Sequence, residues 1–315
     1  MDSAGKVRRV LVQNMRELPQ SAWPHWTLMC ANTYEFVDRE HGRVVRVFSV
    51  ERLEPGDTTQ MALEYVPRHR NSYDVLFVNL KFPLPGSGPN LAEPIGGTLT
   101  YRPECLWSEG GTTYAATPPV SGHIEVNIYL QSEGSSGEPM VTLRQVASAV
   151  ASLDREQPGC LQHARGEYLA PDGTVREALE VCWERIVGGK FPYPDPPPLD
   201  FPLTFPVAAY PWHPSPSEHG VQYKSFVSVN ATGPFVKLVR LDEGAELGSV
   251  SLDEHRLVAV LAGRVRYESE SLSDLNVLFG SPGTVLAQMV AEEPTLLWVV
   301  QWRPKDDPLS SKWTN

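Results

Sequence analysis

The sequence predicts a mainly β protein, in which two strand-rich halves are joined by a small helical insert and a proline-rich strap. Short segments rich in β-branched and aromatic residues, bounded by Gly, Pro or Asn, fill both halves of the 315-residue chain. Proline supplies 29 of these residues, a share well above the usual ~5%, and this disfavours an all-helical protein. The two strand-rich halves also share sequence patterns in the same order, which predicts a duplicated β domain.

The first half is expected to form strands between residues 35 and 135. Each candidate segment is short and is bounded by turn residues, as is typical of an antiparallel sheet. The predicted strands are Arg43–Val50, Met61–Val66, Tyr73–Leu80, Gly97–Tyr101, Thr112–Ala116 and His123–Leu130.

Two capping boxes predict helices after these strands. Thr142 and Gln145 begin the first helix, Thr142–Leu153, whose apolar residues share one face. Thr174 and Glu177 are expected to begin the second, which ends at Gly188 and Gly189 because glycine favours the left-handed cap.

A proline-rich strap follows, with ten prolines between Pro192 and Pro216. Such a segment cannot form a helix or a central strand, so we expect it to be extended. Exposed phenylalanines at this density would be a liability, and Phe191, Phe201 and Phe205 are therefore expected to be buried.

Strands return in the last third of the chain, which completes the expected layout. The predicted strands are Gln222–Val229, Phe235–Leu241, Leu257–Tyr267, Thr284–Val290 and Thr295–Trp302. The expected domains are a first barrel over 1–138, the helical insert over 139–189, the strap over 190–216 and a second barrel over 217–315.

Two patterns recur in both halves. Arg52–Gly56 follows a predicted strand in the first half, as Arg240–Gly244 does in the second. Further along, Gly111–Leu130 aligns without gaps on Gly283–Trp302. The shared pattern is Gly-Thr, a strand, a turn that contains proline and an apolar strand, so the two barrels are predicted to be related by duplication.

Composition argues against several classes of partner and location. The net charge of −11 and the lack of a long run of Lys or Arg disfavour nucleic-acid binding. The first residues lack the apolar core of a signal peptide, and the longest apolar stretches are far shorter than the ~20 residues of a membrane span. The four cysteines show no CxxC pattern, which favours a reduced, cytoplasmic setting.

The second half resembles the cupin family in the run VKLVRLDEGAEL…RLVAVLAGRV, which is followed by SPGTVLAQMV. The segment that leads into it, Trp212…Gly220-Val221-x-x-Lys224, is similar to cupins of the anti-sigma-factor type. The resemblance covers residues 210–303 well and 35–132 less well. It implies a bicupin of two small antiparallel barrels, each with a small-molecule pocket and commonly with a metal held by His-x-His, a Glu and a later His.

The second barrel departs from that metal pattern. Residues 248–251 stand where the resemblance implies the two histidines, and Thr295 lies near the position of the later one. His255 is left alone, and one imidazole does not hold a catalytic metal. This barrel is expected to be metal-free and to serve packing or dimerisation, which makes a second copy of the chain a candidate partner. The alternative is a pocket that binds an organic ligand without a metal.

The first barrel keeps more of the pattern that the resemblance implies. His69 falls at the second position of the His-x-His pair, Asp74 is near the family's carboxylate, and His123 follows a Pro-Pro turn like the last ligand. Two histidines and one carboxylate suit Fe(II) or another divalent metal. Period-2 alternation would separate His69 from Asp74, so a bend at Asn71-Ser72 is needed. The alternative is that His69 lies in a surface turn, Asp74 caps a strand and His123 is an ordinary loop residue.

These residues favour an enzyme that acts on a small organic molecule. The leading interpretation is a non-haem metal-dependent oxygenase in which Tyr101 or Arg70 orients an acidic substrate and Trp107 lines the pocket. A second interpretation has no metal, and His123, Glu125 or Tyr114 moves protons in an isomerase, cyclase or lyase. A third is a ligand-binding bicupin without catalysis.

Overall fold

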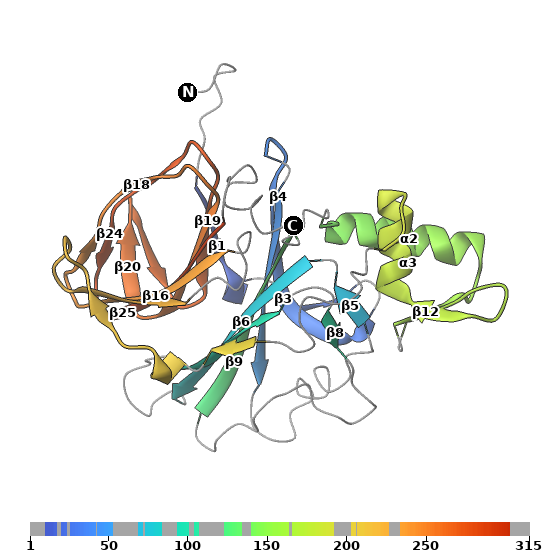
Figure 1. Cartoon of the computed structure of the whole chain (residues 1–315), viewed down its shortest axis with the longest axis horizontal. Coiled ribbons are helices and arrows are strands. Elements are labelled where there is room, and N and C mark those ends of the chain that lie inside the picture. The colour runs from blue at the N-terminus through green and yellow to red at the C-terminus, as the bar shows by residue number, and fades with distance from the viewer. Residues whose placement is uncertain are drawn as a thin grey trace, which may run out of the picture. The chain divides into compact units, whose positions relative to one another are not determined.

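The chain forms two β-rich units, shown in Figure 1. One contains residues 1–18, 80–96 and 205–315, and the other contains residues 19–79 and 97–204. The computed structural model describes residues 10–17, 20–23, 26–41, 43–52, 69–71, 73–83, 93–100, 104–106, 123–133, 140–163, 166–191, 203–205, 207–226 and 234–302. No α-helix within these ranges is long and apolar enough to cross a membrane.

The C-terminal barrel has a seven-stranded sheet in the order β1-β22-β19-β25-β16-β15-β14. Its strands are β1 (Leu11–Asn14), β14 (His213–Pro214), β15 (Val221–Phe226), β16 (Phe235–Leu241), β19 (Arg256–Ala262), β22 (Asn276–Gly280) and β25 (Thr295–Gln301). Shorter strands form a four-stranded sheet, β17-β24-β20-β21, and a separate pair, β18-β23. They are β17 (Glu246–Leu247), β18 (Val250–Ser251), β20 (Arg264–Tyr267), β21 (Glu270–Ser273), β23 (Val285–Leu286) and β24 (Met289–Ala291).

The interior of this barrel is packed with hydrophobic side chains from both sets of strands. Alternate residues of each strand face the interior, so Val258 and Val260 of β19 join Leu297 of β25. The other buried members of this interior cluster are Val221, Val239, Leu241, Ala245, Leu252, Val265, Tyr267, Leu272, Leu278, Leu286, Met289 and Ala291.

The N-terminal barrel has a seven-stranded sheet in the order β13-β7-β6-β9-β4-β3-β2. Its strands are β2 (Gln20–Trp23), β3 (Trp26–Asp38), β4 (Arg43–Arg52), β6 (Tyr73–Pro83), β7 (Glu93–Thr100), β9 (His123–Glu133) and β13 (Leu203–Phe205). A separate antiparallel pair consists of β5 (His69–Asn71) and β8 (Glu104–Leu106).

The two large sheets have the same strand order. In the N-terminal sheet β7-β6-β9-β4-β3-β2 occupies the places of β22-β19-β25-β16-β15-β14 in the other. The pair β5-β8 corresponds to β18-β23, because β5 and β18 precede the strands β6 and β19, while β8 and β23 follow β7 and β22. The prediction of a mainly β fold with two antiparallel barrels is confirmed.

The end strands of the sheets come from unexpected parts of the sequence. β1 pairs with β22, with Leu11 opposite Phe279 and Asn14 opposite Asn276. Residues 10–17 were expected with the first barrel, whereas they lie in the compact unit that contains the C-terminal barrel. The linear domain limits at 138, 189 and 216 otherwise stay a prediction.

Several strand limits differ from those expected. Leu257–Tyr267 is two strands, β19 and β20, because Gly263 turns the chain between them with a φ of +84°. Thr284–Val290 is likewise divided into β23 and β24. Met61–Val66 and Thr112–Ala116 lie outside the described residues. The strands β1 and β2 and the first part of β3 were not predicted.

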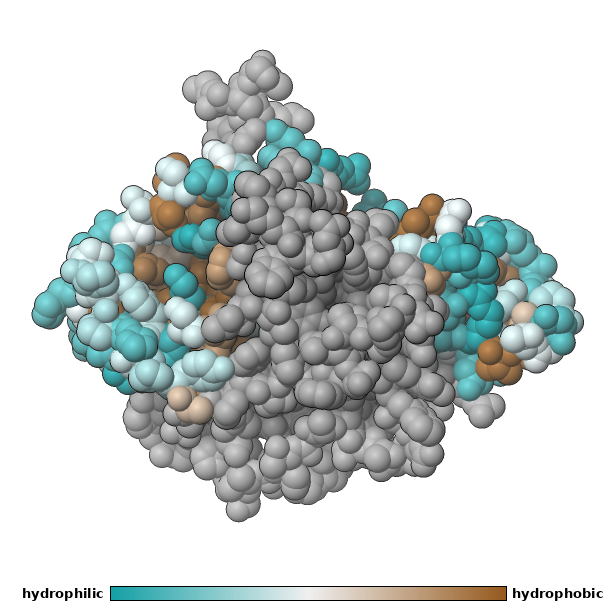
Figure 2. Space-filling view, in the orientation of Figure 1, coloured by the Kyte–Doolittle hydropathy of each residue, from teal (hydrophilic) through white to brown (hydrophobic). Residues whose placement is uncertain are grey.

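The helical insert confirms one predicted capping box. Helix α2 (Leu143–Glu156) begins at the N-cap Thr142, whose side chain accepts a hydrogen bond from the Gln145 amide, while the Gln145 side chain accepts one from the Thr142 amide. On the face drawn in Figure 2 the insert exposes mainly hydrophilic residues.

The predicted start of the second helix at Thr174 is wrong. Val175–Glu177 forms strand β12, and helix α3 (Ala178–Val187) begins only after it, with Glu177 as the N-cap. β12 pairs with β11 (Glu167–Leu169), which pairs with β10 (Leu161–Gln162). Residues 175–177 are therefore part of a small antiparallel sheet and cannot form the first turn of the predicted helix. The predicted end is confirmed, since Gly188 caps the helix in the left-handed conformation.

The buried N-cap Glu177 predicts that the stability of the fold depends on pH. Burial raises the pKa of Glu177 to about 8 from an ordinary value of 4.5, against the hydrogen bonds from the Leu179 and Glu180 amides that favour the charged form. Because the pKa of Glu177 is higher in the folded state than in the unfolded state, the protonated side chain stabilises the fold. Its contribution to the free energy of unfolding is complete below about pH 4.5 and is lost as the pH rises to about 8. We expect the thermal midpoint, followed by Trp183 fluorescence, to fall across this window. The Glu177→Gln variant should lose this slope, and an equal slope in both proteins would contradict the assignment.

The strap is described only in part. Phe191 is buried, as expected, with its ring 5.3 Å from that of Trp183. Phe201 and the side chain of Phe205 lie outside the described residues. After the short 3-10 helix η3 (Val207–Ala209) comes β14. Both β13 and β14 are end strands of their sheets, which is where proline-rich segments can pair.

Candidate functional site

The three candidate metal ligands lie at or next to the starts of strands in the N-terminal barrel. His69 is the first residue of β5, Asp74 is the second residue of β6, and His123 is the first residue of β9. β5 ends at Asn71 and β6 begins at Tyr73, and the two strands belong to separate sheets. Ser72, where part of the bend was expected, lies outside the described residues. The side chains of all three residues lie outside the described part, and their convergence stays a prediction.

The other candidate residues are located by backbone position or are outside the description. Arg70 is in β5, opposite Cys105 of β8. Glu125 is in β9, directly opposite Arg52 of β4. Tyr101, Trp107 and Tyr114 lie outside the described residues. The roles expected of these five residues are therefore neither confirmed nor contradicted.

Strand β9, which begins at His123, is the counterpart of β25 in the C-terminal sheet. β9 lies between β6 and β4, and β25 lies between the equivalent strands β19 and β16. His123 begins β9 as Thr295 begins β25, and the gapless sequence alignment pairs the same two positions. Thr295 is 2% exposed, and Leu297, which is two residues further along β25, belongs to the interior cluster. Positions 123 and 125 share one face of β9, and Glu125 lies opposite Arg52 as Leu296 lies opposite Arg240.

The two large sheets have matching strand orders, and each is accompanied by a matching pair of short strands. This duplicated arrangement of antiparallel sheets is the fold that the resemblance to cupins implies. Residues 250 and 251, within the region where the resemblance places the histidine pair, lie on β18, the counterpart of β5.

Comparisons with known proteins give similarity in structure only. No family model matches this chain, and no curated protein matches it. A provisionally assigned dioxygenase from Nostoc punctiforme is 8% identical, with a TM-score of 0.47, over 95% of this chain and 85% of that one. Oxalate decarboxylase from Lactobacillus farciminis is 11% identical, with a TM-score of 0.43, over 95% and 88%. The Rhodobacter sphaeroides complex of SigE with the anti-sigma ChrR is 14% identical, with a TM-score of 0.27, over 30% and 51%.

A buried polar network in the N-terminal barrel was not predicted from the sequence. Arg46 of β4 is 2% exposed and donates from Nε and Nη2 to Oε1 of Glu35, at 3.0 and 2.8 Å. It also donates to Oε1 of Gln131 and to the carbonyl oxygen of Val141, both at 2.8 Å. The same Glu35 oxygen accepts from the Leu143 amide. The guanidinium therefore joins three neighbouring strands to the first turn of α2.

This network lies on a defined face of the sheet. Glu35, Arg46 and Gln131 are directly opposite one another across β3, β4 and β9. Gln131 is an even number of residues from His123 and Glu125, so all three positions share one face of β9. The network is close to the end of that strand, whereas the candidate ligand begins it.

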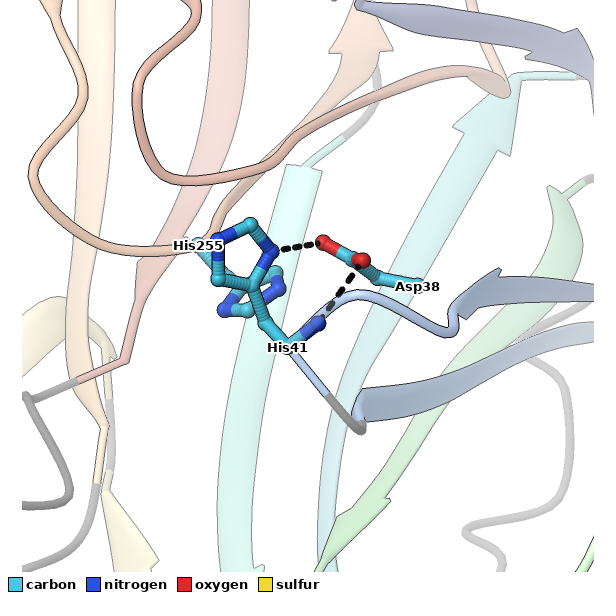
Figure 3. Close-up of side chains that lie close together, drawn as sticks. All are labelled: Asp38, His41 and His255. Carbon is cyan, nitrogen blue, oxygen red and sulfur yellow. Dashed lines mark hydrogen bonds and ion pairs between the residues drawn. The ribbon is translucent and has the colours of Figure 1, made fainter. Parts of the chain in front are cut away.

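A second unpredicted contact lies at the hairpin between β3 and β4 (Figure 3). Oδ2 of Asp38 is 2.8 Å from Nδ1 of His41, and Oδ1 accepts from the Glu40 and His41 amides. Both side chains are at least partly buried, at 10% and 28% exposed. These bonds hold the turn, and a carboxylate accepting two amides at a strand end is a common turn device.

In the C-terminal barrel the positions that the resemblance assigns to metal ligands have structural contacts. The Thr295 hydroxyl donates to the carbonyl oxygens of Arg264 and Glu293 and accepts from the Arg264 amide. Val250 packs against the interior cluster. His255 is 2% exposed and stacks on Phe279, with ring centroids 5.5 Å apart.

Proposed function

We propose that this chain is a cupin-type enzyme acting on a small organic molecule, with its site in the N-terminal barrel and a divalent metal, Fe(II) in the first instance, held by His69, Asp74 and His123. The observation that carries the proposal is the place of His123 at the start of β9, the counterpart of the central strand β25. The separation of β5 and β6 into different sheets supports it, because a continuous strand would direct His69 and Asp74 to opposite faces.

The donor set fits such a metal. Two imidazoles and one carboxylate suit non-haem iron and leave open positions. The bound metal would supply activation of oxygen for an oxygenase reaction. His123 would hold its ligand position from the start of β9, and Glu125, two residues on, would move a proton at the substrate. Arg70 or Tyr101 would orient an acidic group of the substrate, and Trp107 would line the pocket.

Metal analysis of the purified full chain tests the proposal. We expect about one equivalent of a divalent metal per chain, and the His123→Ala variant should retain less than about a tenth of it, because a three-ligand site rarely survives the loss of one ligand. The matched control is His219→Ala, which removes an exposed histidine of the other unit and should leave the metal content unchanged.

The other outcomes separate the alternatives. If the wild-type chain holds no metal after loading with Fe(II), Mn(II) or Zn(II), the metal-dependent proposal fails. The metal-free isomerase, cyclase or lyase, in which His123, Glu125 or Tyr114 moves protons, then becomes the leading function. Metal content that is equal in the wild type and in His123→Ala would also overturn the assignment of the ligands.

A further inference from the structure

The two helices of the insert, α2 and α3 in Figure 1, form the walls of a surface groove. They pack against each other through a hydrophobic core that includes Val146, Val150 and Cys182, so the walls are held in place. The groove has a volume of about 390 Å³, and no acidic side chain is among the described residues that line it. The lining includes two arginines, two serines and two apolar residues, namely Arg144, Arg185, Ser148, Ser152, Ala149 and Ile186. We call it the α2–α3 groove.

Two arginines give the α2–α3 groove a positive charge. Arg144 is exposed and makes no hydrogen bond or ion pair with any described residue. Arg185 is also exposed, and its Nη2 donates to Oγ of Ser152 at 2.9 Å and pairs with the Glu156 carboxylate. Its Nε and Nη1 donate no hydrogen bond within the part of the chain that the structure describes. Because a guanidinium carries five N–H donors in a planar fork, each arginine can bind a further carboxylate through two parallel hydrogen bonds.

The spacing of the arginines favours an extended peptide as the ligand. Ser152, which Arg185 contacts, comes eight residues after Arg144 in α2, and this corresponds to about 12 Å along the helix axis. In an extended peptide, side chains four residues apart point to the same side and are separated by about 13 Å. Acidic residues at the first and fifth positions of such a segment would therefore reach the two arginines. The residue at the third position would face the apolar lining, Ala149 and Ile186.

Bonds at the start of α2 fix the backbone at Arg144 before any ligand binds. The N-cap Thr142 closes the first turn, and the Leu143 amide donates to Oε1 of Glu35 at 2.8 Å. One turn further along the groove, the Ser148 hydroxyl has no hydrogen-bond partner among the described residues and is available to a peptide carbonyl oxygen. A groove that is formed in advance lowers the entropic cost of binding.

Glu156 competes with an acidic ligand for Arg185. Its side chain is 55% exposed, and an ion pair at such an exposed position is screened by solvent and stabilises little. A ligand carboxylate can therefore bind the same guanidinium, but it meets the negative charge of Glu156. Removal of that charge should strengthen the binding.

We propose that the α2–α3 groove binds an acidic segment of a partner protein in an extended conformation, with carboxylates at its first and fifth positions on Arg144 and Arg185 and an aliphatic residue at its third. The positive groove is complementary in charge to such a segment. The helical insert thereby has a role of its own, as the surface that recruits a partner. This role does not depend on the metal centre proposed for the N-terminal barrel.

Calorimetric titration of the full chain tests the proposal, with the peptide acetyl-Thr-Asp-Thr-Leu-Thr-Asp-Thr-amide as the probe. We expect saturable binding with a Kd below about 1 mM that weakens at high salt, because the contacts are exposed charge pairs. The same peptide with Asn in place of both Asp residues should bind about tenfold more weakly, because charge-assisted hydrogen bonds are lost. Arg144→Gln should weaken binding of the Asp peptide by about fivefold, and Glu156→Gln should strengthen it by about twofold.

The matched control is Arg155→Gln, because Arg155 is an exposed arginine of the same helix that does not line the groove. This variant should bind the Asp peptide like the wild type. Absence of saturable binding to the wild type, equal affinity for the Asn peptide, or equal affinities of Arg144→Gln and Arg155→Gln would each overturn the proposal. Displacement of the peptide by inorganic phosphate below about 1 mM would assign the groove to a phosphate ligand instead.

A measurement on the wild-type chain guards against misfolding of a variant. The amide resonances of Ser148 and Ser152 should shift when the Asp peptide is added, and not when the Asn peptide is added. Unchanged resonances at saturating Asp peptide overturn the proposal whatever the variants do. The metal content of the chain is a separate readout, so this test and that of the enzyme proposal can fail independently.

Discussion

Replacing Arg46 with methionine is expected to destabilise the N-terminal barrel by about 3–5 kcal/mol, because breaking a buried ion pair leaves its partner uncompensated. Glu35 is only 15% exposed and would lose both bonds from the guanidinium, and Oε1 of Gln131 and the Val141 carbonyl oxygen would each lose their donor in Arg46. The measurement is the urea midpoint, together with hydrogen exchange at the Leu143 amide, which should become faster because its acceptor is Glu35.

A double variant provides the control. Arg46→Met combined with Glu35→Leu removes both charges, and hydrophobic replacement of a whole buried pair is often neutral or stabilising. The double variant should therefore be more stable than Arg46→Met alone. A loss of under about 1 kcal/mol in the single variant would show that the network is not an important support for the sheet and α2.

Replacing Gly263 with alanine is expected to cost the C-terminal barrel about 2–5 kcal/mol. The residue has a φ of +84°, which an L side chain rarely adopts. A Cβ atom there would lie 2.2 Å from the Pro294 carbonyl oxygen and 2.7 Å from the Thr295 Cα, so backbone would have to move. The conformational cost and the cost of overpacking therefore add. The shift of the thermal midpoint measures the sum.

Gly244→Ala separates these two contributions. Gly244 has a φ of +76°, and no atom lies within 4 Å of the Cβ that alanine would add. This variant should lose only about 1 kcal/mol, the conformational part. Equal losses in the two variants would mean that the close approach of Pro294 and Thr295 to Gly263 has no energetic effect.

Local patterns allowed much of the fold to be predicted from the sequence. The capping box at Thr142, the left-handed cap at Gly188 and the strand Phe235–Leu241 match the structure, because each depends on residues adjacent in the chain. The duplicated order of strands was also predicted, and the alignment that pairs His123 with Thr295 agrees with their places at the starts of β9 and β25.

Features that depend on distant residues were missed. Arg46 contacts Glu35, Gln131 and Val141, which come from three other segments, and no spacing in the sequence marks them as partners. The helix start at Thr174 failed for a similar reason, because pairing of β12 with β11 competes with the capping box.

The pairing of β1 with β22 has a consequence for how the protein is made. Leu11 leaves the ribosome long before Phe279, its partner in the finished sheet, has been translated. Until β22 has been translated, β1 has no partner strand. Once β22 has left the ribosome, its outer edge can pair with other strands until β1 binds to it. Closing such a distant pair is slow compared with forming local hairpins. Completion of the C-terminal barrel is therefore coupled to a segment translated about 260 residues before its partner strand, and an agent that binds residues 11–14 during synthesis would impair the closing of this barrel.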